Sequence, residues 1–194
     1  GSRTSLHKPE IPSLSHQAGS VDCTTMNSSF SARRREPCTS ADVVAFWRNA
    51  GPEHWFRKDT TFDTQFRERF AAEHDAAARG ELADWQDSAE GALALLILLD
   101  QYPRNSFRNT PRMFATDAQA AAVAAAAIAR GFDRQMGDDM QRFFYLPFMH
   151  SEQLADQERC VELYRPLGGD GLRYAEIHRD AIARFGRFPH RNPV

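Results

Sequence analysis

Several polar side chains stand where a helical repeat would place apolar ones, and Asp100 is the clearest case. It follows directly after the apolar run 93–99, so its carboxylate is expected to face the interior or the floor of a cleft. A buried, ionised carboxylate needs a cation nearby. Arg104 and Arg108 follow it, and their planar guanidinium groups suit bidentate pairing. Two hypotheses stay open: an ion pair that ends the helix, or an anion-binding site formed by the free arginine and Asn105.

His150 lies in an aromatic-rich stretch, residues 142–152, which begins with Arg142 and contains a proline. The apolar side chains of this stretch cannot all face solvent, so we expect this connection between helices to insert into the domain. We expect His150 and Gln157 to share the inward face of the following helix. His150 could act as a general base, a metal ligand or a buried hydrogen-bond donor. Its spacing from Glu152 is weak evidence for a metal, and no metal site is predicted.

The C-terminal end combines an apolar stripe with positive charge. The stripe repeats at three- and four-residue intervals and contains one histidine: Tyr174, Ile177, His178, Ala181, Ile182 and Phe185. From Arg173 onward, five arginines oppose two acidic residues, a net charge of +3. Together with the phenylalanines between them, Arg187, His190 and Arg191 could hold a phosphate, a carboxylate or nucleic acid. Arginines near the end of a helix also simply complement its dipole.

Glycine and proline mark the boundaries of the elements that must position these side chains. Apolar periodicity between those boundaries predicts helices over residues 40–50, 60–79, 88–101, 117–130, 151–165 and 171–185. The central helix, 88–101, should end at Pro103. No strand-like alternation occurs anywhere, so the sequence predicts an all-α domain of about six or seven helices packed as antiparallel hairpins.

Length and composition fit one compact domain. The chain has 194 residues, 42% apolar and 26% charged, which is typical of a globular protein. Residues 1–40 are rich in serine and lack periodicity, so they are predicted to be flexible, and residues 41–194 to form the helical domain. The opening Gly1-Ser2 resembles a cleavage scar. A natural start at Met26 would leave residues 1–25 outside the native protein.

Charge and hydropathy restrict the partners. A formal net charge of -2 argues against a protein dedicated to binding duplex nucleic acid. The longest apolar stretch, residues 92–99, is too short for a membrane span, and no signal sequence opens the chain, so a cytoplasmic protein is expected. The sequence contains no phosphate-binding loop, dinucleotide fingerprint or paired-cysteine set, and no cofactor is predicted.

Four motifs in order resemble a bacterial family, domain-of-unknown-function family 924. They are LLDQYPRN at 98–105, FATD at 114–117, FFYLPFMHSE at 143–152 and RFGRFPHRN at 184–192. The resemblance runs from about Ala41 to the C-terminus. It implies an all-helical, tetratricopeptide-like fold, and it implies no particular reaction, substrate or cofactor.

Three classes of function remain open. In the first, stacked hairpins form a binding module whose concave surface receives an acidic small molecule or peptide, through Trp47, Trp55, Arg104, Arg108, Arg142, Arg187 and Arg191. In the second, the protein is an enzyme that uses Asp100 and His150 as acid and base groups. In the third, the polar motifs only lock loops onto helices, and the protein is a scaffold.

Overall fold

The computed structural model describes residues 38–191, and all regular structure in that range is helical. The α-helices are α1 (Ser40–Ala50), α2 (Pro52–Trp55), α3 (Thr60–Ala78), α4 (Ala89–Leu96), α5 (Tyr102–Ser106), α6 (Asp117–Ala129), α7 (Asp138–His150), α8 (Leu154–Tyr164) and α9 (Gly169–Phe185). The all-α prediction is confirmed for this range. None of these helices is long and apolar enough to cross a lipid bilayer. The segment predicted to be flexible, including Met26, lies almost wholly outside the described residues.

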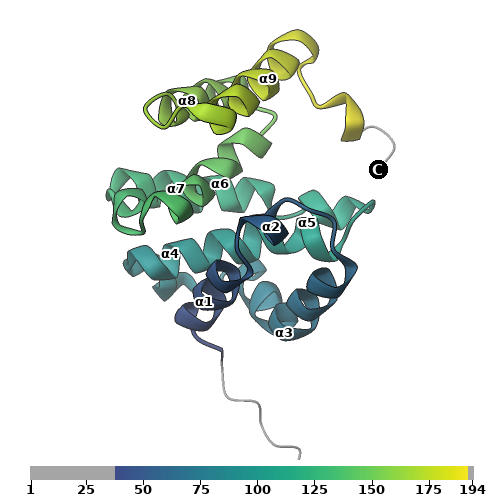
Figure 1. Ribbon diagram of the computed structural model, residues 1–194, viewed down its shortest axis with the longest axis vertical. Coiled ribbons are helices and arrows are strands. Elements are labelled where there is room, and N and C mark those ends of the chain that lie inside the picture. The colour runs from purple at the N-terminus through teal and green to yellow at the C-terminus, as the bar shows by residue number, and fades with distance from the viewer. Residues whose placement is uncertain (1–37, 192–194) are drawn as a thin grey trace, which may run out of the picture. The chain divides into compact units, whose positions relative to one another are not determined.

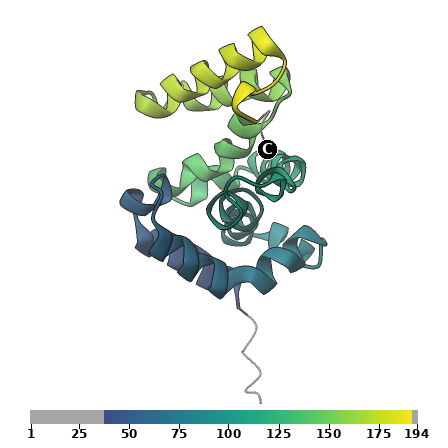
Figure 2. The same ribbon diagram turned by 90° about the vertical axis from the view of Figure 1, so that its right-hand side faces the viewer.

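Helices that follow one another along the chain also pack together in space. In the second half of the described chain, α6 packs against α7, α7 against α8, and α8 against α9 (Figures 1 and 2). In the first half, α4 contacts α1, α6 and α7, so it occupies the centre of these helices. This order agrees with the predicted helical hairpins and is compatible with a tetratricopeptide-like arrangement, which stays a prediction.

An aromatic cluster holds α1 and α3 together. Phe62, Phe66 and Phe70 repeat every four residues along α3, and all three are buried. The indole of Trp47, on α1, is fully buried and lies 5.3 Å from the Phe66 ring, centroid to centroid. Trp55 packs beside it and donates from Nε1 to the Trp47 carbonyl oxygen at 2.7 Å. The two tryptophans therefore contribute to the core.

The predicted end of the central helix at Pro103 is wrong. The helix changes to a π-helical turn at Ile97–Gln101 and continues as α5 through the proline. Proline has no N–H, so the carbonyls of Leu98 and Leu99 lose the donor that a π- or α-helical ladder would supply. Two side chains replace that donor. Nδ1 of His74 donates to Leu98 at 2.9 Å, and Oγ1 of Thr116 donates to Leu99 at 2.5 Å.

The aromatic stretch 142–152 was expected to be a connection, but most of it is helical. It forms the second half of α7, with Pro147 inside the helix and His150 as its last residue. Residues 143–149 are all buried, as in a helix that is apolar on every side, and this burial outweighs the helix-breaking tendency of the proline. His150 therefore does not share a helix face with Gln157, which belongs to α8. The Gln157 amide instead reaches back and donates to the Met149 carbonyl at 2.8 Å.

Candidate functional site

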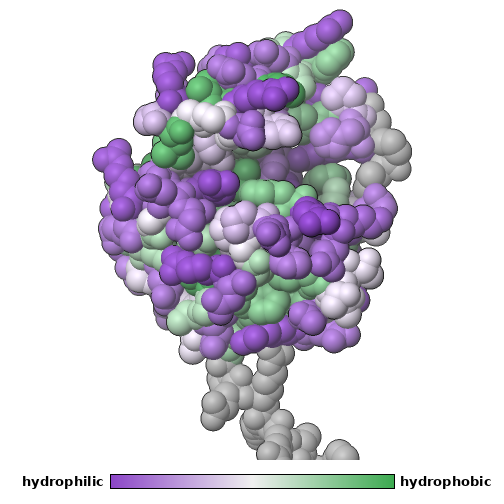
Figure 3. Space-filling view, in the orientation of Figure 1, coloured by the Kyte–Doolittle hydropathy of each residue, from purple (hydrophilic) through white to green (hydrophobic). Residues whose placement is uncertain are grey.

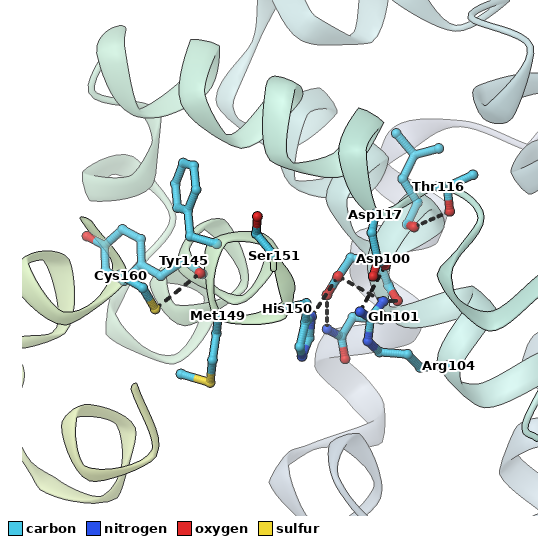
Figure 4. A network of polar contacts seen from close by, with 12 residues as sticks. Asp100, Gln101, Arg104, Thr116, Asp117, Tyr145, Met149, His150, Ser151 and Cys160 are labelled. Carbon is cyan, nitrogen blue, oxygen red and sulfur yellow. Dashed lines mark hydrogen bonds and ion pairs between the residues drawn. The ribbon is translucent and has the colours of Figure 1, made fainter. Parts of the chain in front are cut away.

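Five titratable side chains from separate parts of the chain converge at one place. Asp100 comes from the π-helical turn, Arg104 from α5, Asp117 from the first turn of α6, His150 from the end of α7, and Arg191 from the 3-10 turn Pro189–Arg191. Contacts between their side chains connect all five, and Figure 4 shows four of them. The sequence had indicated four of the five. Asp117 was missed because it sits at an ordinary acidic position in the first turn of a helix.

Asp100 is the buried centre of this cluster, with 1% of its surface exposed. Its Oδ1 lies 2.8 Å from Nδ1 of His150 and 3.0 Å from Nη1 of Arg104. Its Oδ2 accepts a hydrogen bond from Nε2 of Gln101 at 2.6 Å. Burial alone would raise the pKa of Asp100, but the charge of Arg104 and the contacts with His150 and Gln101 outweigh it and lower the pKa. Asp100 is therefore ionised at neutral pH.

His150 is neutral and has a defined orientation. Burial, reinforced by the charge of Arg104, lowers the pKa of its imidazole despite the neighbouring Asp100. Because the Asp100 carboxylate can only accept, the hydrogen of the neutral ring must lie on Nδ1. The other nitrogen, Nε2, makes no hydrogen bond to any of residues 38–191 and is not among their buried unpaired atoms. Since 19% of this side chain is exposed and Nε2 is not a buried atom, solvent can reach Nε2.

Asp117 and Arg191 close the cluster on its other side. Arg104 is shared between two carboxylates, because its Nη2 lies 2.9 Å from Oδ1 of Asp117. Arg191 Nη1 lies 3.3 Å from the other Asp117 oxygen, and Arg191 Nη2 donates to the His150 carbonyl at 2.8 Å. Burial raises the pKa of Asp117 in spite of Arg104, and the charge of Asp100 adds to the effect. Two carboxylates thus face two guanidinium groups around a neutral imidazole, and the cluster carries no surplus positive charge.

The π-helical turn contains Asp100 and sets the direction of Arg104, which follows it in α5. A π-turn inserts one extra residue into a helix, so it changes the direction of every side chain after it relative to the preceding helix. Nη1 of Arg104, which contacts the Asp100 carboxylate, also donates to the Asp100 backbone carbonyl at 2.8 Å. This hydrogen bond connects the π-helical turn to α5. Single π-turns inside helices occur frequently at functional sites. The apolar residues before Pro103 contain no sequence signal that would predict the π-helical turn.

Arg108 and Asn105 belong to a different ion pair. Arg108 donates from Nε to Oδ2 of Asp63 at 2.8 Å and from Nη2 to Oδ1 at 3.1 Å, which is the predicted bidentate geometry with another carboxylate. Asn105 donates to the same Oδ1 at 2.8 Å. Asp63, on α3, is 7% exposed. Arg104 alone therefore pairs with Asp100, and Arg108 and Asn105 tie α5 to α3.

The remaining C-terminal candidates lie around Phe188. Glu152 accepts a hydrogen bond from the Phe188 backbone N–H at 2.9 Å. The rings of His178 and His190 lie 5.4 and 5.5 Å from the Phe188 ring, centroid to centroid. Arg187 is exposed. Phe188 itself is buried, so these contacts fasten the C-terminal turn to the helices.

Other predicted ligand residues lie outside this cluster. Trp47 and Trp55 are in the core, as described above. Arg142, on α7, has a buried Nε without a hydrogen-bond partner, and its carbonyl accepts from the Tyr164 hydroxyl at 3.4 Å. In residues 38–191, no group of three or more His, Cys, Asp or Glu side chains is arranged to hold a metal ion.

The surface of residues 38–191 is hollowed in more than one place. Figure 3 shows it hollowed between the α8–α9 pair and the helices below, at the level where α7 leads into α8. His150, the last residue of α7, is at that connection. A second depression, a pocket of about 410 Å³ between α1 and α3, is lined by Phe46, His54 and Phe62 among others. None of the predicted site residues lines that pocket, so we place the candidate site at His150.

The neutral state of His150 predicts a pH dependence of stability. Because the folded protein holds the pKa of His150 below its ordinary value of 6.5, the unfolded chain binds this proton more readily. The free energy of unfolding should therefore fall as the pH drops through about 6.5 and below. Urea denaturation at a series of pH values should show a shallower loss for His150→Gln than for the wild type. Identical slopes would mean that folding leaves the pKa of His150 unchanged.

Comparisons with known proteins give a family and a structural relative. The family model described as "Bacterial protein of unknown function (DUF924)" matches residues 43–194. A solved structure of a protein of unknown function from Agrobacterium tumefaciens is 54% identical, with a TM-score of 0.78. The match covers 79% of this chain and 87% of that chain. The comparison with curated proteins gave no match.

Proposed function

Because the chain belongs to the DUF924 family, whose description assigns no activity, we propose a function from the geometry of its polar cluster. The protein is an enzyme in which His150, oriented by Asp100, acts as a general base. One observation carries this proposal: a buried, ionised carboxylate contacts Nδ1 of the imidazole at 2.8 Å, and Nε2 remains accessible to solvent.

This arrangement has the parts that proton transfer requires. A carboxylate on Nδ1 fixes the tautomer in which Nε2 carries a lone pair, and it stabilises the imidazolium that forms when Nε2 takes a proton. Arg104 supports this role because it keeps Asp100 ionised. A base that is neutral at pH 7 is already in the form that accepts a proton. His150 would therefore be the catalytic base, with Asp100 and Arg104 as positioning residues.

The proton donor is a water molecule or a hydroxyl group of the substrate. The two hydroxyl side chains nearest in sequence to Asp117 and His150 have other partners: Thr116 donates to the Leu99 carbonyl, and Ser151 donates to Oδ2 of Asp156 at 2.6 Å. A serine or threonine nucleophile beside His150 therefore has no support among these residues. The reaction class that fits is hydrolysis or transfer to a hydroxyl, and the base activates the attacking oxygen.

Turnover of a substrate panel tests this proposal. Wild-type protein and His150→Gln would be assayed against chromogenic p-nitrophenyl carboxylates, phosphates and glycosides. We expect the best substrate to lose about 10²–10⁴-fold in rate with His150→Gln, the usual contribution of a general base. His54→Gln is the matched control, because His54 is 42% exposed and lies outside the cluster. Equal rates for wild type and His150→Gln would contradict the proposal.

A measurement without a substrate tests the same nitrogen. Diethyl pyrocarbonate acylates accessible, unprotonated imidazole nitrogens, and peptide mass mapping identifies which histidine has reacted. We expect His150 to react at pH 7. The absence of reaction at His150 under conditions that modify His54 would show that Nε2 is not available as a base.

A scaffold is the second candidate, and one specific observation favours it. Arg191 connects the C-terminal turn to both Asp117 and the end of α7, and the buried Phe188 anchors the same turn. These contacts are sufficient to explain why polar residues occur here even without catalysis. Binding of an acidic ligand at this cluster has weaker support, because Arg104 and Arg191 already face carboxylates.

A further inference from the structure

The outward face of α9 is apolar and largely exposed, and the Arg184 guanidinium lies 4.9 Å from the centroid of the Phe185 ring. Tyr174, Ile177 and Phe185 are 56%, 50% and 52% exposed, although their spacing had predicted one side of an amphipathic helix. The residues of α9 that are buried are Ala175 and Ile182, on the side that packs against α8. Figures 1 and 2 show α9 at the edge of the helical array. We call Tyr174, Ile177, Ala181 and Phe185 the α9 face.

Positive charge lies next to the α9 face. Arg173 and Arg184 stand on one edge of it, near its two ends, and Arg187 follows just after the helix. All three are exposed, and none has an ion pair with a carboxylate of residues 38–191. Asp180, on the same edge, is already paired with Arg179 at 2.6 Å. Glu176, the other exposed carboxylate on this side, offsets one of the three arginines, so a net positive charge remains beside the apolar stripe.

We propose that the α9 face docks an acidic amphipathic helix of a partner protein. Apolar side chains of such a helix, spaced by three and four residues, would cover Tyr174, Ile177 and Phe185. Its flanking aspartates and glutamates would meet Arg173 and Arg184, and opposite charges at the rim speed association and select the partner. This surface is separate from the His150 site, and the proposal does not depend on the proposed function.

An exposed apolar helix face could also bind a second copy of this chain or a membrane surface. The charges of α9 disfavour both. In an antiparallel pair of α9 helices from two copies of this chain, the N-terminal end of one helix lies beside the C-terminal end of the other. Arg173 of each copy would then approach Arg184 of the other, and like charges repel. An anionic membrane surface would also meet the exposed carboxylates of Glu176 and Asp180. An acidic protein segment avoids the first conflict, and it can carry its carboxylates at its two ends, opposite Arg173 and Arg184 and away from Glu176 and Asp180.

Peptide binding to the full chain tests this proposal. The probe is a fluorescein-labelled, 18-residue amphipathic peptide with leucines spaced by three and four residues and glutamates on the flanks. A second peptide keeps the leucines and replaces every glutamate with lysine. In fluorescence anisotropy at low salt, we expect the glutamate peptide to bind more tightly than the lysine peptide. Equal binding of the two peptides would overturn the proposal.

Three variants locate the binding surface. Phe185→Ala should weaken the glutamate peptide about tenfold or more, as loss of a central aromatic anchor does. Phe56→Ala should leave binding unchanged, because Phe56 is exposed elsewhere, after α2. Arg184→Glu should weaken the glutamate peptide and strengthen the lysine peptide. All three residues are exposed, so unchanged circular dichroism is expected to show that the fold is intact.

Two results would assign the α9 face to another occupant and overturn the proposal. One is a dimer in sedimentation equilibrium that Phe185→Ala converts to a monomer. The other is co-sedimentation with phosphatidylserine vesicles that Phe185→Ala abolishes, without binding of the glutamate peptide. Unchanged affinity of Phe185→Ala for the glutamate peptide would also overturn it, because the peptide would then bind elsewhere.

Discussion

Replacement of Arg104 by alanine is expected to lower the free energy of unfolding by about 3–5 kcal/mol. Arg104 is the cation that pairs with Asp100, whose carboxylate is 1% exposed, so its loss leaves a buried charge without compensation. The same change removes the hydrogen bond to the Asp100 carbonyl and the contact with Asp117. Urea denaturation followed by circular dichroism measures the loss.

Two further variants distinguish the effect of leaving a charge buried from the effect of losing an ion pair. Arg79→Ala breaks an exposed pair with Glu81, and we expect it to destabilise the protein far less than Arg104→Ala does. The double variant Asp100→Asn, Arg104→Ala should lose less stability than the sum of its single variants, because the buried charge is gone. A loss below about 1 kcal/mol for Arg104→Ala would mean that solvent reaches and screens Asp100.

The sequence predicts the helices well because their signals are local. Apolar periodicity identifies α3 through Phe62, Phe66 and Phe70, and glycine marks the ends of α1, α6 and α9. The errors occur where a local rule competes with burial. Pro103 and Pro147 both lie inside helices because distant side chains or dense packing compensate for the missing N–H.

The candidate site could be predicted only in part, because its contacts join residues that are far apart in the sequence. Asp100 was expected to be buried beside an arginine, and Arg104 is that residue. Two arginines were available at helical distance, and the choice between them depends on Asp63, which pairs with Arg108 from 45 residues upstream. No local pattern connects Asp63 to Arg108, or His150 to Asp100. Such pairs become visible only when the packing of α3, α5 and α7 is known.

The polar cluster links stability to the proposed chemistry. Burial lowers the pKa of His150 and Arg104 adds to this effect, while the same guanidinium lowers the pKa of Asp100 against its burial. A variant of Arg104 should therefore change the pH profile of turnover as well as stability. A role limited to holding the fold would change stability alone. The comparison of the two measurements on one variant distinguishes a positioning role of Arg104 in catalysis from a purely structural one.

Phe66→Ala is expected to destabilise the protein by about 3–5 kcal/mol, the usual cost of removing a fully buried phenylalanine. Phe66 has no exposed surface, and its ring contacts those of Trp47, at 5.3 Å, and Tyr102, at 5.2 Å. Tyr102 is the first residue after the π-helical turn, so the cavity would also loosen the support of Asp100. Calorimetry and urea denaturation measure the loss.

Phe56→Ala is the matched control, since it removes the same side chain from a position that is 58% exposed. Its ring packs on the outside of the aromatic cluster, 6.2 Å from the Phe143 ring, centroid to centroid. We therefore expect Phe56→Ala to lower the free energy of unfolding by less than about 1 kcal/mol. Similar losses for the two variants would contradict the assignment of Phe66 to the core. If the Phe66 variant is folded, a larger fall in diethyl pyrocarbonate reactivity at His150 than in the control would show that the aromatic cluster supports the site through Tyr102.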